Sequence, residues 1–488
     1  MKTLVLSVVL AVPLAAQTTP PDVAPAVSGA SAAPAVPPAA TPPATAPAPA
    51  APDLVAPPSP EVKAAAQKAA ESVVPKVDAP VVEAPKAAEP KAGSAGPEVE
   101  WTFVKSAAED ADPAVQEAAI ENLRLFASRY PDSAHAPDAL FLLAGLRARK
   151  GDWQPAAAVL LRGIYEYAGA SVELRAKSAY LELMDRKASR RQRPVLNDFV
   201  NRDDVPDKAD RLSALWQKVA EKAPDAFWEP AVEEIRDFFV RFPEHKDNDR
   251  LQAALARLYA ANDRPAAAVV AWRKLLALYP GSGLRAKAQL SIGDLYADAL
   301  RDPKKAIDAY QDLIAQYPRA PEVQAALESS ARLFEDKLRQ YDLAVQMDEQ
   351  VVKAFPKTGA SLKALKAIAR LERERLGKPD EAIKTLQRLA AMHGGQDGVD
   401  ALLLAAETAR RDLKDYGREA ALRHQVSDDF SAAKEAPQAL YDAAGVYEDD
   451  VKDAGKAIET YKEVASKYPT HKLARKATDR AAKLAAAK

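Results

Sequence analysis

An aromatic residue followed by proline recurs at a nearly fixed interval along most of this 488-residue chain. The intact pairs stand at Tyr130-Pro131, Phe242-Pro243, Tyr279-Pro280, Tyr317-Pro318, Phe355-Pro356 and Tyr468-Pro469. From Phe242 the spacings are 37, 38 and 38 residues, and the two longer gaps are close to three such intervals. A constant period of this length indicates a repeat array, in which each unit buries its apolar face only by stacking on its neighbours.

Other positions keep the same period, and we number them from the aromatic residue, which we call the mark. Sixteen residues after a mark there is an apolar residue: Leu146, Leu183, Leu258, Leu295, Leu333, Leu371 or Val446. Twenty-seven residues after a mark there is alanine: Ala157, Ala306, Ala344, Ala382, Ala420 or Ala457. A break between them often holds proline, as at Pro155, Pro230, Pro265, Pro303 and Pro379.

This pattern predicts two helices in each repeat. The first helix runs from about mark +4 to +19 and the second from about +24 to the next mark. Proline is tolerated in the first turn of a helix, because its missing N–H would have no partner there. The Tyr-Pro pair ends the second helix, with the ring expected to lie under the next pair and the proline setting the turn. The alanine at +27 lets the two helices of a pair approach closely.

The unit that contains Ile292-Gly293-Asp294-Leu295-Tyr296, Ala306, Tyr310 and Pro318 resembles the tetratricopeptide repeat, whose signature is L-G-x-x-Y, A-x-x-x-F and P. The resemblance covers about residues 101–480 and implies an all-α, right-handed superhelical solenoid of about ten repeats. The repeat of 37 to 38 residues is longer than the family's 34. The start Tyr130-Pro131-Asp132-Ser133 is similar to long repeats of bacterial envelope proteins, such as the barrel-assembly lipoprotein and the Tol-Pal coordinator.

The N-terminal part of the chain has a different composition. Residues 1–16 combine Lys2 with an apolar run of about 13 residues and a small-residue end, which predicts a secretory signal peptide. An uncleaved anchor is the alternative, although the run is short of the roughly 20 residues that span a bilayer. Residues 17–97 are rich in alanine and proline, which predicts a disordered linker. The solenoid is expected over residues 98–488, with an irregular repeat near 186–230.

Composition and motifs argue against several classes of function. The net charge of -1 does not favour nucleic-acid binding, and the absence of cysteine excludes lipidation, disulfides and thiol chemistry. The five histidines show no metal-ligand spacing along the sequence, and neither Gly281-Ser282-Gly283 nor the glycine-rich stretch 394–398 has the context of a catalytic or phosphate-binding loop. We therefore predict no catalytic residue, no metal and no cofactor.

The irregular repeat carries two features of its own. Ile235, Phe238, Phe239 and Phe242 follow helical spacing, which predicts core packing rather than a ligand cage. The basic stretch 186–194 is expected to be solvated, and its alternative role is contact with an anionic lipid headgroup or cell-wall polymer.

The resemblance also implies where a partner would bind. First helices face the concave groove in this family, and the residue after the motif glycine points into it. Here that glycine is Gly293, so the position at mark +15 holds Asp294, with Arg257, Arg332 and Arg370 in neighbouring repeats. The same position holds Gly145, Glu182, Thr408 and Gly445 elsewhere. The alternative interpretation of these charged residues is a solvated face, with Arg and Asp pairing across repeats.

Taken together, these features predict a non-catalytic scaffold of the bacterial envelope that is exported to the periplasm and binds a protein or peptide. The predicted partners exclude nucleic acid, no transmembrane segment is expected, and peripheral association with a membrane or the cell wall is compatible with the sequence. A second hypothesis is a cell-wall-associated spacer, in which the Ala/Pro-rich tail tethers or spans the envelope.

Overall fold

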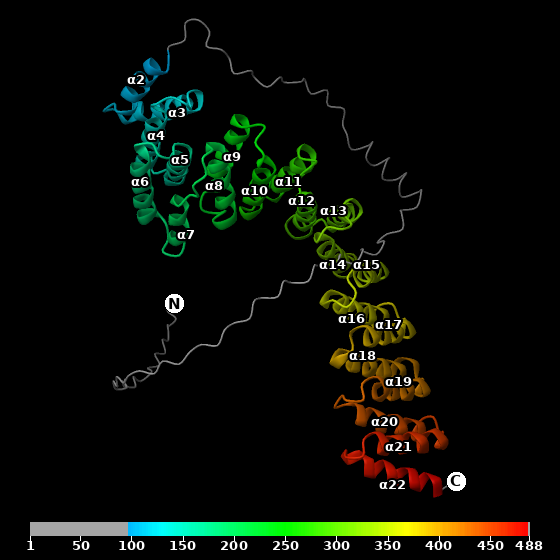
Figure 1. Cartoon of the computed structure of the whole chain (residues 1–488). Helices are drawn as coiled ribbons and strands as arrows, with labels where there is room; N and C mark the ends of the chain where they lie inside the picture. Colours follow the sequence, from blue (N-terminus) through cyan, green and yellow to red (C-terminus); the bar gives the residue numbers. More distant parts are fainter. Residues whose placement is uncertain (1–95, 487–488) are drawn as a thin grey trace, which may run out of the picture. The chain divides into compact units, whose positions relative to one another are not determined.

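The computed structural model describes residues 96–486, which form helices joined by short turns and include no strand (Figure 1). The predicted signal peptide and almost all of the predicted Ala/Pro-rich linker lie outside the described residues, so both remain predictions. None of the helices in the described range combines the length and the apolar character needed to cross a membrane. The all-α array of helix pairs expected from the period is confirmed.

Odd and even helices alternate as the two members of each pair. The first helices are α2 (Pro97–Ala108), α4 (Ala136–Lys150), α6 (Val172–Lys187), α8 (Lys208–Lys222), α10 (Asn248–Ala261), α12 (Arg285–Asp294), α14 (Glu322–Leu333), α16 (Gly359–Glu374), α18 (Gly395–Thr408), α20 (Ala436–Asp449) and α22 (Lys472–Ala486). The second helices are α3 (Pro113–Arg129), α5 (Trp153–Glu166), α7 (Arg193–Asn197), α9 (Trp228–Arg241), α11 (Pro265–Leu278), α13 (Pro303–Gln316), α15 (Tyr341–Ala354), α17 (Pro379–His393), α19 (Tyr416–Asp429) and α21 (Ala454–Lys467).

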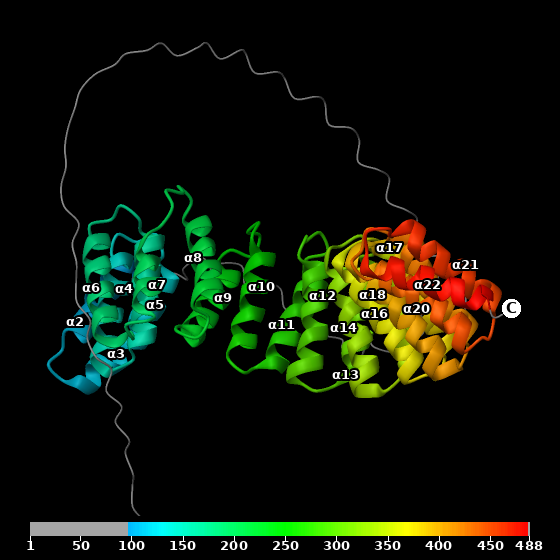
Figure 2. The ribbon, with the colours of Figure 1, turned by 90° about the horizontal axis from the view of Figure 1, so that it is seen from below.

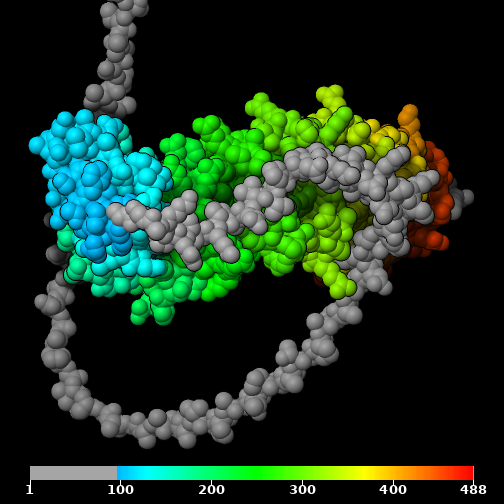
Figure 3. Space-filling view, turned by 90° about the horizontal axis from the view of Figure 1, so that it is seen from above, coloured from blue at the N-terminus to red at the C-terminus, as the bar shows by residue number. Residues whose placement is uncertain are grey.

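Neighbouring helices in the chain are also neighbours in space over most of the array. Consecutive members from α10 to α22 pack against each other in order (Figure 2). Figure 3 shows the surface of the array from one side, with the colours following one another in chain order. The alanines at mark +27 explain the close approach, because Ala157, Ala306, Ala344, Ala382, Ala420 and Ala457 are all fully buried. A larger side chain at these positions would force the two helices of a pair apart.

The second helices begin and end where the sequence predicted. Asp302, Asp415 and Asp453 each accept a hydrogen bond from a backbone N–H in the first turn, and Pro265 and Pro379 occupy first-turn positions in other repeats. The mark follows the last residue of the second helix, as Tyr279 and Tyr317 do after α11 and α13. These terminal signals set the length of each unit independently of the apolar packing.

The mark ring makes a contact that the sequence did not predict. It is half-buried and reaches the first helix of its own pair. Tyr317 accepts a hydrogen bond from Arg285 Nε at 2.8 Å at the start of α12, and the ring of Phe430 lies against Gly398 in α18. In these two repeats the ring ties the end of the second helix to the first helix of the same pair.

The first helices end in a turn that the sequence did not reveal. Three of them widen into a π-helical turn: η2 (Leu295–Ala299), η3 (Phe334–Leu338) and η4 (Ala409–Leu413). A residue with positive φ follows in each repeat, at Asp263, Arg301, Arg339, Gly377, Lys414 and Lys452, which are 37 or 38 residues apart. The wide turn and this left-handed residue reverse the chain into the second helix.

The array is interrupted in the region of the predicted irregular repeat, near 186–230. Its second helix, α7, has five residues and continues into η1 (Asp198–Val200), so α8 packs directly against α5. Arg211, which is buried, crosses this junction and donates to the backbone oxygen of Tyr165 at 2.6 Å. The predicted core reading also holds: Ile235 and Phe238 are buried, and Phe239 and Phe242 pack against the same core.

Candidate partner-binding surface on the first helices

The four charged residues predicted for the groove lie at the same register on successive first helices, α10, α12, α14 and α16. Asp294 accepts a hydrogen bond from the Tyr310 hydroxyl at 2.7 Å, and burial raises the pKa of its carboxyl group. The ring of Tyr310 lies where a side chain on Gly293 would be, since a Cβ there would stand 2.3 Å from Tyr310 Cε1. Glycine at this position therefore leaves the space that the Tyr310 ring occupies.

The three arginines differ in what surrounds them. Arg257 is half-buried, its Nε has no hydrogen-bond partner among the described residues, and burial lowers the pKa of its guanidinium. Arg332 is exposed. Arg370 pairs with Glu335 of the preceding repeat at 2.8 Å, which is the cross-repeat pairing that the alternative interpretation expected. The structure does not gather the four residues around one cavity.

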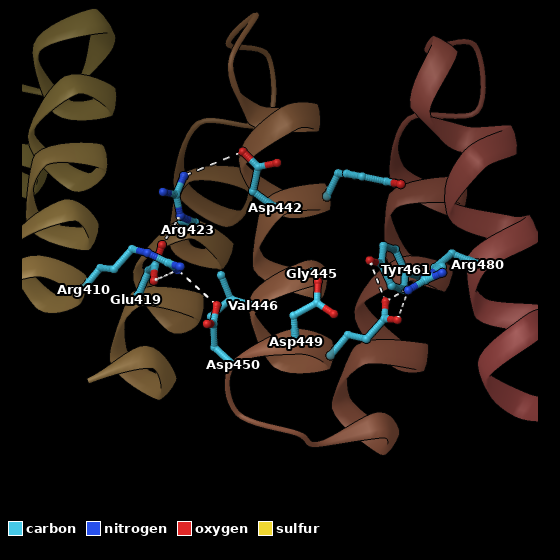
Figure 4. A pocket seen from close by; sticks show the side chains of 12 residues that line it. Arg410, Glu419, Arg423, Asp442, Gly445, Val446, Asp449, Asp450, Tyr461 and Arg480 are labelled. Atoms are coloured by element: carbon cyan, nitrogen blue, oxygen red, sulfur yellow. Dashed lines mark hydrogen bonds and ion pairs between the residues drawn. The ribbon is translucent and has the colours of Figure 1, made fainter. Parts of the chain in front are cut away.

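The register position does line a cavity where it holds glycine near the C-terminal end of the chain. A hollow of about 460 Å³ opens beside Gly445 and is bordered by η4, α19, α20, α21 and α22. In Figure 4, Arg410 and Arg423 stand on one side of Gly445, and Tyr461 and Arg480 stand on the other. Asp442 and Asp449 lie along α20 between these two sides.

The arginines around this cavity are held by carboxylates. Glu419, which is fully buried, accepts from Arg410 Nη1 at 2.8 Å and from Arg423 Nε at 3.0 Å. Glu448 accepts from Arg480 through both of its oxygens and from the Tyr461 hydroxyl at 3.1 Å. The Arg480 guanidinium is the main cause that holds the pKa of Glu448 below its usual range. The walls are thus fixed in place by ion pairs.

A second hollow opens at the same register position near the start of the array. It has a volume of about 140 Å³, lies beside Gly145 and is bordered by α4, α5 and α6. Its lining is mostly apolar and comprises Phe141, Ala144, Gly145, Ala148, Leu160, Ala179 and Leu183, with Glu182 and Arg186 as the polar members. Glu182 and Arg186 pair with each other at 3.0 Å. This cavity offers contact area without unpaired charge.

Both hollows exist because the register position carries no side chain. A Cβ on Gly145 would meet only the Arg149 guanidinium, at 3.9 Å, and a Cβ on Gly445 would meet only the Tyr461 hydroxyl, at 3.7 Å. The sequence held this signal, since both glycines interrupt the charged row at mark +15. Sequence reasoning missed it because it looked for charge at this position and not for missing volume.

Two clusters of histidine and carboxylates also form on packing, although histidine spacing predicted no metal site. His424, Asp428 and Glu463 converge across α19 and α21, and Asp207, Asp210 and His245 converge beside α8. In the first cluster Lys467 contacts both carboxylates at 2.6 Å, and in the second Lys246 contacts Asp210 at 2.8 Å. A lysine ammonium thus pairs with carboxylate groups of each cluster, and the residues form ion-pair networks between repeats.

Comparison with known proteins agrees with the architecture. Residues 287–320, which include most of α12 and all of α13, match the family model of the tetratricopeptide repeat, and a search of curated proteins gives no match. Similar solved structures include a tetratricopeptide repeat protein from Parabacteroides merdae, with 16% identity over 56% of this chain and 98% of that chain at a TM-score of 0.30. PilF of Pseudomonas aeruginosa has 17% identity over 48% and 98% at 0.29, and the type IV pilus biogenesis factor PilW has 20% over 47% and 98% at 0.27. These values are too low to transfer any function.

Proposed function

We propose that this protein is a non-catalytic scaffold that binds a partner protein or peptide along its first helices. The observation that carries the proposal is the pair of hollows beside Gly145 and Gly445, at the register position that the repeat resemblance assigns to the groove. Concave hollows whose walls are largely preformed are the usual form of a recognition site. Each hollow has room for protruding side chains of a bound chain.

The proposal includes a compartment. The predicted signal peptide at residues 1–16 supports export, and the resemblance of the long repeats to envelope proteins supports a periplasmic scaffold. The absence of cysteine argues against an acyl anchor, so association with a membrane or the cell wall would be peripheral. Cell fractionation of the full-length protein, followed by N-terminal sequencing of the mature chain, tests export and cleavage together.

The binding role is tested by filling the hollows without changing the fold. A variant with Gly145→Gln and Gly445→Gln places a side chain in each cavity, and glutamine is a better helix former than glycine. Affinity capture from envelope extracts, quantified by mass spectrometry against the wild-type chain, is expected to lose a defined partner. An unchanged set of captured proteins, with both chains equally stable to heat, would contradict the proposal.

The spacer hypothesis makes a different prediction for the same assay. Deletion of residues 17–97 removes the Ala/Pro-rich segment and leaves both hollows intact. If the scaffold proposal is right, the truncated chain keeps its partner in capture experiments. If the segment is the working part, the truncated chain loses its localisation in the envelope, while the double glutamine variant behaves like the wild-type chain.

A further inference from the structure

We propose that the cavity beside Gly445 selects a basic side chain, lysine or arginine, of the bound partner. This inference rests on the proposed function, because it names the chemistry of the partner that the scaffold would hold. It is carried by the charges that line the cavity and by which of them are already paired.

Negative charge is in excess around this cavity. Five carboxylates line it (Glu419, Asp442, Glu448, Asp449 and Asp450) against three guanidinium groups (Arg410, Arg423 and Arg480), so 5 − 3 leaves two negative charges. Each guanidinium is committed to carboxylates: Arg410 to Glu419 and Asp450, Arg423 to Glu419, and Arg480 to Glu448. An anionic ligand would have to break one of these pairs, whereas a cation would not.

The unpaired charge belongs to α20. Asp449 is exposed and has no ion pair or hydrogen bond to another side chain among the described residues. Asp442 has only a long contact of 3.7 Å to Arg423 and a hydrogen bond from Gln438 at 2.7 Å. These two aspartates therefore hold the acceptor capacity that the protein leaves unused.

The spacing of these aspartates favours a side chain over a bare ion. Asp442 and Asp449 are seven residues apart on one helix face, which places their backbones about 10 Å apart along the axis. One metal ion cannot be coordinated by both at that separation. A long side chain can lie along the bare helix surface at Gly445 and bring an ammonium or guanidinium group to either carboxylate.

An aromatic wall adds to the same preference. Tyr441 lines the cavity and packs edge-on against Tyr461, with ring centroids 5.3 Å apart. The face of a tyrosine ring attracts cations, and charge-assisted hydrogen bonds to a carboxylate are stronger than neutral ones. A lysine or arginine side chain fits this cavity better than any other protein side chain. Its apolar stem can lie on the helix surface, and its cationic head can reach the ring and a carboxylate.

The test uses the purified full-length protein and three labelled nine-residue peptides that alternate alanine with lysine, glutamine or glutamate. Fluorescence anisotropy at low salt is expected to give the tightest binding for the lysine peptide, weakening as salt is added. The double variant Asp442→Asn/Asp449→Asn should lose about tenfold in affinity for this peptide, equivalent to about 1.4 kcal/mol. The Gly445→Gln variant should lose affinity as well.

A matched control removes the same charge elsewhere. The double variant Glu459→Gln/Asp479→Asn neutralises two exposed carboxylates of α21 and α22 that do not line the cavity. It should bind the lysine peptide like the wild-type chain. Thermal unfolding followed by circular dichroism checks that every variant is folded.

The outcomes separate this inference from the function on which it rests. Equal affinity for lysine and glutamine peptides, or equal losses in the cavity and control variants, would overturn the selection of a basic side chain. If the glutamate or glutamine peptide binds and Gly445→Gln abolishes that binding, the cavity is still a binding site and only the charge preference is wrong. If none of the three peptides binds, the charge preference is also wrong, and capture by the double glutamine variant decides the scaffold role separately.

Discussion

The two hollows occupy the same place in the repeat but have different chemistry. Each lies beside a glycine at mark +15, with an aromatic residue one turn earlier: Phe141 before Gly145 and Tyr441 before Gly445. The residue after the aromatic is Leu142 in α4 and Asp442 in α20. One turn after the glycine, α4 has Ala148 where α20 has Glu448. The repeat frame thus sets where a hollow opens, and the flanking side chains of the same helix set what it can bind.

This comparison also explains why the charged cavity does not collapse. Buried charges are tolerated only when they are paired and hydrogen-bonded, and Glu419 and Glu448 each meet an arginine. The apolar cavity needs no such pairs, because Phe141, Leu160 and Leu183 are uncharged and lie on helices that already pack against each other. A single substitution can therefore change one cavity without affecting the other.

The largest effect is expected at Asp348, a buried carboxylate that forms no ion pair with any residue between 96 and 486. Burial raises its pKa to about 7, so its protonated form is the stable one in the folded chain. Its contribution to stability is therefore present in full below its unfolded pKa of about 4 and is lost as the pH rises through about 7. Asp348→Asn should raise the free energy of unfolding by about 2–4 kcal/mol at pH 8, relative to wild type.

The pH series checks the sign of this prediction. Urea unfolding of both chains between pH 4 and 8 should show the gap between them shrinking toward pH 4. Asp336→Asn, at an exposed position in the neighbouring turn η3, is the matched control and should show no such gap. A gap that widens at acid pH would mean that Asp348 is stabilised as the carboxylate.

The next prediction tests the repeat register from which both cavities are assigned. Ala306→Leu or Ala382→Leu adds three methyl or methylene carbons at a fully buried helix-helix contact, which should cost about 1–3 kcal/mol through overpacking. Thermal unfolding measures the cost. If both variants melt like the wild-type chain, the register from which the cavities are assigned is wrong.

Alanine substitutions then distinguish the glycine whose neighbouring space is filled by a ring from the two glycines beside which the space is open. Gly293→Ala should destabilise the chain by about 1–2 kcal/mol, because the new Cβ meets the Tyr310 ring. Gly145→Ala and Gly445→Ala should be neutral or stabilise by up to about 1 kcal/mol, since alanine replaces glycine inside a helix with no clash. A loss of stability at Gly445 as large as that at Gly293 would show that its neighbours close around it.

The register of the repeats could be predicted from the sequence because it is periodic. The alanines at +27 and the marks recur at one interval, so each repeat supported the others in predicting a buried contact and a helix end. The five-residue α7 could be anticipated only as an irregularity, since Pro194 breaks the period without indicating what replaces the missing helix. The wide turns at the ends of the first helices were missed because non-glycine residues such as Arg301 and Lys452 adopt positive φ there.

The candidate site was harder to predict because it depends on contacts between repeats. Nothing in the local sequence pairs Arg370 with Glu335 or places Glu463 beside His424, which lie 35 and 39 residues apart. The charged residues at mark +15 lie on α10, α12, α14 and α16, whereas the two hollows open on α4 and α20, where the same position holds glycine. Whether a residue there binds a partner depends on which neighbour already satisfies it, and that appears only after packing.

The smallest effect on stability is expected at the charged register between the two glycines, where the original prediction placed partner contacts. Arg370 and Glu335 are 42% and 23% exposed, and such pairs contribute about 0–1 kcal/mol. Arg332 is exposed as well, so reversing both arginines to glutamate should lower the melting temperature only slightly.

If these arginines contact the partner, the reversed chain should capture less of it at low salt. The variant Lys304→Glu/Lys337→Glu reverses the same charge at exposed positions outside the register and should capture the partner normally. Equal capture by the two reversed chains would leave partner binding to the hollows beside Gly145 and Gly445 and remove the charged row from it.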